Sequence, residues 1–162
     1  MNRNNNIPET GWTCIAVHDL KDRMDVADQQ YLKCEKCNNE KVRFVHIMRH
    51  PDYSGDLCVG RICAERMSGD STGPMEKEND LQRRAKRRKG FCDGYWAFNY
   101  ERQTYCRKYK GKFITLKKCV NGNWCVVFQN NFYFDHNGRS MKSFAEAQYV
   151  AFDIYEETMG IR

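Results

Sequence analysis

The stretch YLKCEKCNNEKVRFVHIMRHPDYSGDLCVGRICAERM (residues 31–67) carries four of the nine cysteines and two of the four histidines of a 162-residue chain. Cys34 and Cys37 lie three positions apart, a spacing that lets both sulfur atoms reach one tetrahedral metal ion at about 2.3 Å. Cys63 comes where a helix is expected to begin, and the partial positive charge of a helix N-terminus favours a thiolate. The three cysteines predict one structural Zn²⁺ site.

The fourth ligand is chosen from the hairpin expected between the second and third cysteine ligands. If the turn pairs His50 with Leu57, His46 lies opposite Arg61, beside the helix start, whereas Cys58 faces the other side of the strands. His46 is therefore the predicted fourth ligand, with His50 and then Cys58 as alternatives, because a shift of one residue in the pairing reverses the faces. A redox-active cysteine pair and simply buried thiols are the alternatives to metal binding.

The rest of the chain predicts an α+β protein in four segments. Apolar and β-branched residues predict strands at 11–20, 41–48 and 57–60. Pro74 opens a second helix in which acidic residues come first and basic residues last, as the helix dipole favours, and Gly90 is expected to interrupt or end it. The expected segments are a disordered leader (1–10), a zinc-binding module (11–70), a basic helical connector (71–109) and a small ββ(β)α unit (110–162).

The C-terminal unit contains two local signals. Asn121 and Gly122 lie between two strand-like segments and predict a tight hairpin turn, since both residues adopt positive φ easily. Ser143 and Glu146 have the spacing of a capping box, which predicts a helix over 143–159. A further helical piece is expected within 91–107. The expected architecture is thus a treble-clef-like zinc module joined by a basic helix to a small antiparallel hairpin or sheet with a C-terminal helix.

Positive charge is concentrated in the middle of the chain. The net charge is +6, but residues 82–118 alone contain 13 Lys and Arg against two acids, which leaves −5 for the remainder. Such asymmetry favours a polyanionic partner, and the aromatic residues among these bases suit stacking on unpaired bases. The expected nucleic-acid-binding residues are Arg83, Arg84, Lys86, Arg87, Arg88, Lys89, Arg107 and Lys108.

Several motifs together resemble a family of small, largely uncharacterised bacterial proteins. They are GWTC near the start, the Cys34–Cys37 pair, RFVHIMRHPDY, VGRICAERM and the later RRAKRR, and the match extends from about residue 11 to residue 89. The resemblance implies a zinc-binding module and carries no activity with it. This chain departs from the pattern at Arg61, where the similar proteins usually have cysteine.

Three functions are compatible with these observations. The leading hypothesis is a non-enzymatic nucleic-acid-binding protein with a structural zinc site. The alternatives are a protein-interaction module, acting as adaptor or inhibitor on an acidic partner in a bacterial or phage assembly, and a metal-dependent nuclease. We find no nucleophile with its base, no Walker loop and no HExxH motif, so no catalytic residue is assigned. The sequence shows no signal peptide or membrane span, which predicts a cytoplasmic protein.

The remaining cysteines show no ligand spacing and are expected to be reduced thiols, mostly buried. They are Cys14, Cys92, Cys106, Cys119 and Cys125.

Overall fold

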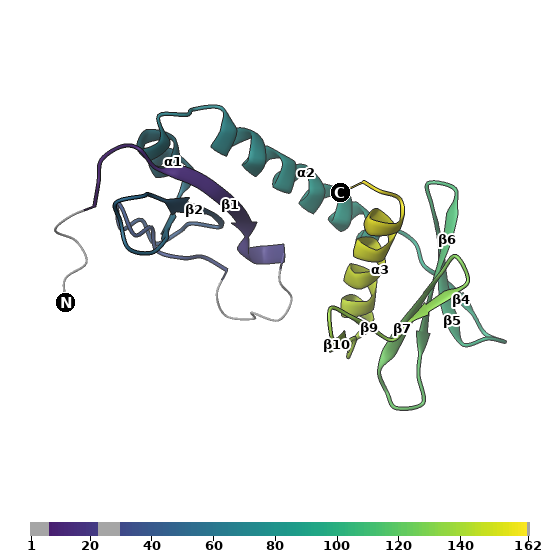
Figure 1. Ribbon diagram of the computed structural model, residues 1–162. Helices are drawn as coiled ribbons and strands as arrows, with labels where there is room; N and C mark the ends of the chain where they lie inside the picture. The colour runs from purple at the N-terminus through teal and green to yellow at the C-terminus, as the bar shows by residue number, and fades with distance from the viewer. Residues whose placement is uncertain (1–6, 23–29, 162) are drawn as a thin grey trace. The chain divides into compact units, whose positions relative to one another are not determined.

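The computed structural model describes residues 7–22 and 30–161, and the chain divides into two compact units, residues 1–85 and 86–162 (Figure 1). The fold is α+β, with antiparallel sheets and, in the described residues, three α-helices. No helix within these ranges is long and apolar enough to cross a membrane.

The first unit contains a three-stranded antiparallel sheet in the order β1-β2-β3. The strands are β1 (Thr13–Asp19), which leads into the 3-10 turn η2 (Leu20–Asp22), β2 (Phe44–Arg49) and β3 (Leu57–Val59). Helix α1 (Arg61–Ser68) follows directly, and helix α2 begins at Gly73. These elements confirm the three predicted strands and the predicted helix start.

The core of this unit is small. Trp12, Met48 and Val59 are among its buried residues, which also include Val42, Val45, Leu57, Ala64 and Met67. Ile7 packs against this core, and the indole N–H of Trp12 donates to the carbonyl of Pro8 at 2.8 Å. Residues 1–6 of the predicted leader lie outside the described residues, but its last part is packed on the unit.

The β2–β3 pairing differs from the predicted one by two residues. His46 pairs with Val59 rather than with Arg61, and Ile47 pairs with Cys58. A shift of two residues keeps every side chain on its expected face, because strand side chains alternate with a period of two. His46 and Cys58 therefore still lie on opposite faces, as predicted.

The second unit is built on a five-stranded antiparallel sheet in the order β4-β5-β6-β7-β8. The strands are β4 (Ala97–Asn99), β5 (Thr104–Tyr109), β6 (Lys112–Lys118), β7 (Trp124–Phe128) and β8 (Asn131–Tyr133). A short hairpin, β9 (Asp135–His136) and β10 (Arg139–Ser140), precedes helix α3 (Phe144–Thr158), which packs against β6 and β7. The capping box is present as predicted, since the Ser143 hydroxyl accepts from the Glu146 N–H at 3.1 Å.

Three details of the second unit differ from the predictions. Helix α2 (Gly73–Asp93) runs through Gly90, because the buried Phe91 ring anchors its last turn and Arg107 donates to the carbonyls of Gly90 and Phe91. Residues 97–99 and 104–109 form β4 and β5 rather than a second helical piece, since β5 is paired along its length with β6. At the β6–β7 turn only Gly122 has a positive φ, and the closing pair is Cys119 and Asn123.

Candidate metal centre

The Cys34–Cys37 segment folds into a tight knuckle because its backbone groups bond to one another. The N–H of Cys34 donates to the Asn39 carbonyl at 2.7 Å, and the N–H of Asn38 donates to the Cys34 carbonyl at 2.9 Å. Asn38 has a φ of 63°, a left-handed conformation that asparagine tolerates better than most residues do. The turn therefore holds both cysteines on its inner side without a glycine.

The knuckle is attached to the free edge of β3. Glu35 lies between the two cysteines, and its N–H donates to the Cys58 carbonyl at 3.0 Å. Its carboxylate accepts from the Cys58 N–H at 2.5 Å. Because β3 leads straight into α1, this contact fixes the knuckle relative to the first turn of that helix.

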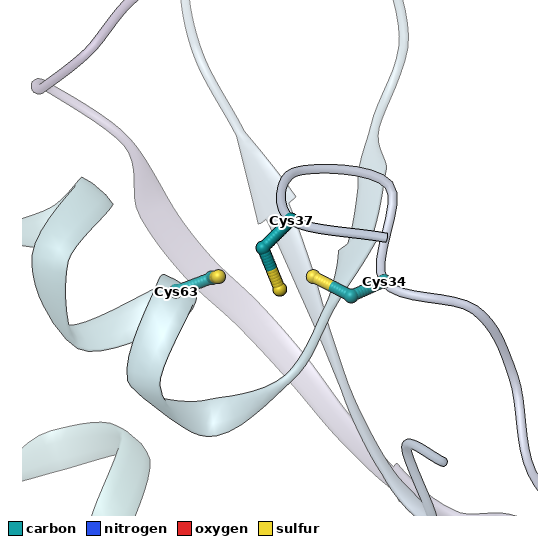
Figure 2. A group of neighbouring side chains, drawn as sticks. All are labelled: Cys34, Cys37 and Cys63. Atoms are coloured by element: carbon teal, nitrogen blue, oxygen red, sulfur yellow. The ribbon is translucent and has the colours of Figure 1, made fainter. Parts of the chain in front are cut away.

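Cys63 completes a group of three thiols. The sulfur atoms of Cys34, Cys37 and Cys63 all lie within 4.8 Å of one another, and in Figure 2 they converge from the knuckle and from the first turn of α1. Cys34 and Cys63 are buried, whereas Cys37 is exposed. Three convergent thiols at this separation can hold one metal ion, so the sequence-predicted cysteines are brought together by the fold.

The surroundings of the group favour thiolates to different degrees. Burial opposes ionisation of Cys34, but the N–H groups of Cys37, Gly60 and Lys36 outweigh it and lower the pKa of the Cys34 thiol. Burial, together with the hydrogen bonds that the Cys63 thiol donates to Cys37 and Cys34, raises the pKa of Cys63 to about 12. Cys34 is therefore easier to ionise than an ordinary cysteine, and thiols bind a metal in their deprotonated form.

A pocket of about 340 Å³ lies beside the sulfurs. All three cysteines line it, together with Lys41, Arg61 and Arg66 among others. Positive side chains beside a thiol stabilise its ionised form. Arg61 is therefore part of the wall of the candidate metal centre.

His46, the predicted fourth ligand, lies in the interior of the unit with other partners. It is 0% exposed, its Nε2 lies 3.2 Å from the Glu78 carboxylate, and its Nδ1 lies 3.8 Å from the Cys14 sulfur. Burial lowers the pKa of its imidazole, although the hydrogen bond that the ring donates to the Glu78 carboxylate opposes this shift. The structure does not include His46 in the three-thiol group, and both of its ring nitrogens already have neighbours.

The two alternative ligands also lie elsewhere. The His50 Nδ1 accepts from the Asp52 N–H at 3.0 Å in the turn after β2, and its ring lies 5.2 Å from that of Trp12. Cys58 meets the knuckle through its backbone, and burial raises the pKa of its thiol. Within the described part of the chain, the group that can hold a metal comprises Cys34, Cys37 and Cys63.

Of the other five cysteines, Cys125 is buried and the rest are partly buried. Cys119 lies in the turn between β6 and β7, and Cys125 lies on β7, where it pairs with Lys117. Their thiols are nevertheless close enough to share a hydrogen bond, which adds to the effect of burial in raising the pKa of Cys125 to about 11.

The predicted nucleic-acid-binding arginines of α2 have acidic partners. Arg84 is 8% exposed and pairs with Asp22 at 2.9 Å in the first unit. In the second unit, Arg88 is 4% exposed and its Nη2 lies 2.6 Å from Asp153. These partners lie more than 60 residues away in sequence, and no local signal identifies them. Burial makes Arg84 and Arg88 poor candidates for contact with phosphates.

The other predicted binding residues are more accessible. Arg87 pairs with Glu156 at 2.8 Å, Arg83 with Asp80 at 3.0 Å, and Lys89 with Asp93. Lys86 is exposed on α2 and Lys108 is exposed on β5, whereas Arg107 packs over the rings of Phe91, Trp96 and Tyr109. Binding of nucleic acid by these residues stays a prediction.

No family model, no curated protein and no solved structure matches this chain.

Proposed function

We propose that this chain is a non-enzymatic nucleic-acid-binding protein in which Zn²⁺ has a structural role. The observation that supports nucleic acid binding most directly is the charge of residues 94–134, which contain seven Lys and Arg and one acid. All four arginines of α2 are paired with carboxylates, but a single acid cannot balance the seven bases of residues 94–134. Excess positive charge of this kind attracts phosphates and releases their counterions.

Zinc is the proposed metal because the donor set consists of thiolates, and a Cys-x-x-Cys knuckle followed by a cysteine at a helix start suits tetrahedral zinc. The order of knuckle, β2–β3 hairpin and α1 supports a treble-clef-like module. The apolar core of the first unit is small, so the metal would contribute much of its folding free energy. His46 stays a prediction as fourth ligand, and binding would require its ring to leave Glu78.

The zinc proposal is tested by comparing two cysteine variants. Cys37→Ser is expected to lose the metal and the stability of the first unit, whereas Cys58→Ser, on the same edge but outside the thiol group, keeps about one zinc per chain. Zinc content is measured by elemental analysis, and X-ray absorption counts the sulfur ligands. A metal-free Cys37→Ser protein that unfolds like the wild type would rule out a structural metal.

Nucleic acid binding is tested by fluorescence anisotropy with labelled single-stranded and duplex oligonucleotides over a series of salt concentrations. The affinity is expected to fall steeply as salt rises, because several phosphate contacts release counterions. If the zinc-loaded protein binds neither probe at low salt, the proposed function is wrong, and docking on an acidic protein becomes the next hypothesis to test.

A further inference from the structure

The five-stranded sheet of the second unit has one covered face and one open face. The covered face carries Ile114, Leu116, Val126 and Phe128, which are buried in a core with residues of α3 and with Phe91. Strand register places alternate residues on the opposite face. We call this opposite side the open face; along its central strands it includes Cys106, Lys108, Phe113, Thr115, Lys117, Val127 and Phe132, whereas Thr104 and Cys125 lie on the same face but are buried.

Two phenylalanine rings protrude from the open face. Phe113 on β6 is 67% exposed and Phe132 on β8 is 61% exposed. Phe134, 59% exposed, lies beside Phe132 with its ring almost parallel, at 13° and 6.3 Å between centroids. Exposed aromatic rings grouped on one surface usually mark a binding site, since scattered single rings are what an ordinary surface shows.

Lysines on the same face accompany the rings. Lys108 pairs with Phe113 in the strand register, and its ammonium group lies 5.6 Å from the centre of that ring. Lys117 is exposed two strand positions past Thr115 on β6. The open face therefore offers apolar rings and positive charge at neighbouring positions, which is the combination that a nucleic acid strand requires.

The spacing of the rings suits more than one base. Phe113 and Phe132 lie two strands apart and one pleat repeat apart along the strands, so their Cα atoms are separated by about 12 Å. In a duplex the bases already stack on one another and hide their faces, whereas unpaired bases can stack on exposed rings. Some antiparallel sheets bind single-stranded RNA by stacking bases on aromatic residues of an open face.

We propose that the open face binds single-stranded nucleic acid, with Phe113 and Phe132 stacking on bases and Lys108 and Lys117 contacting phosphates. This inference rests on the proposed function and adds the surface and the strand type. It also moves the contacts away from the paired arginines of α2, which the sequence alone had favoured.

The test compares Phe113→Ala/Phe132→Ala with the wild type, using the full-length zinc-loaded protein and labelled oligo-dT of about 12 nucleotides. Each lost stacking contact lowers affinity by at least about fivefold, so the double variant is expected to bind roughly 25-fold more weakly. Tyr95→Ala is the matched control, because its ring is 84% exposed but lies outside the strands. Both variants should unfold like the wild type, since no buried side chain is changed.

A second variant tests the lysines independently of the rings. Lys108→Ala/Lys117→Ala is expected to reduce the magnitude of the slope of log affinity against log salt by about 1.4. Each phosphate contact on a single strand contributes roughly 0.7 to this slope, and the variant loses two contacts. The ring variant should leave this slope unchanged. A general loss of folded structure would change both the affinity for oligo-dT and its salt dependence in either variant.

The possible results distinguish this inference from the proposed function. If the wild type binds oligo-dT and the ring variant binds equally well, the open face is not the binding surface, although the proposed function stands. If the wild type prefers a duplex of the same length and the rings have no effect, single-strand stacking is refuted. If the wild type binds neither probe, the proposed function fails, and this inference fails with it.

Discussion

Arg88 provides the clearest test of how the basic helix works. The sequence suggests a phosphate contact, whereas the structure shows a buried ion pair with Asp153 and a guanidinium 4.9 Å from the centre of the Tyr149 ring. Removing one partner of a buried pair costs about 3–5 kcal/mol. The Asp153 side chain is 19% exposed, so water screens part of the remaining charge, and we expect Arg88→Met to lower the free energy of unfolding by about 2 kcal/mol.

Arg83 supplies a matched comparison on the same helix. Its side chain is 70% exposed and that of its partner Asp80 is 73% exposed. Pairs between exposed side chains contribute about 0–1 kcal/mol, so Arg83→Met should be close to neutral. A double-mutant cycle with Asp153→Asn isolates the interaction of Arg88, and a coupling free energy of at least about 1 kcal/mol is expected.

Urea unfolding of the whole chain measures these differences. Two of its three tryptophans, Trp96 and Trp124, pack against the core of the second unit, so fluorescence largely follows the unit that contains Arg88 and Asp153. The Arg88–Asp153 pair does not stabilise the protein if Arg88→Met has the same free energy of unfolding as Arg83→Met. The same conclusion follows if Arg88→Met weakens oligonucleotide binding without changing the free energy of unfolding. Either result would mean that Arg88 acts on the surface.

Three further predictions concern the helices and the buried histidine. Gly90→Ala should stabilise the protein by about 0.5–1 kcal/mol in urea unfolding, because a Cβ there meets nothing within 4 Å and alanine favours the helix. Ser143→Ala should cost about 1 kcal/mol through the lost cap of α3, with the exposed Ser140→Ala as a neutral control. Burial lowers the pKa of His46 below its value in the unfolded chain, so acidification below about pH 6.5 should destabilise the first unit by up to about 1.4 kcal/mol per pH unit. His46→Gln should weaken that pH dependence in thermal unfolding, and an unchanged profile would mean that another group causes it.

The sequence predicts the structure correctly where the signal lies in residues close together in the chain. The spacing of Cys34 and Cys37 already places two sulfurs on one turn, and Cys63 follows from the expected helix start. The capping box of Ser143 with Glu146 likewise involves residues one helical turn apart. In these cases the chain between the residues is too short to adopt many alternatives, so the spacing limits the geometry.

The predictions from sequence are wrong where a residue far along the chain determines the local structure. Residues 104–109 form a strand because β5 pairs with β6, and helix α2 passes Gly90 because Phe91 is buried in a core built from later residues. The partners of His46 likewise could not be foreseen, since Glu78 lies 32 residues further along the chain. Tertiary packing overrides local preference in each of these places.

The sequence by itself determined the group of three thiols, the two main hairpins, the C-terminal helix and the charge imbalance of the chain. Only the tertiary structure decided which charges and rings are accessible. It gave Arg84 and Arg88 carboxylate partners from remote segments, and it left Phe113 and Phe132 exposed on one face of a sheet. The physical reason is that charge and ring content are properties of composition, whereas exposure depends on what long-range folding brings against each side chain.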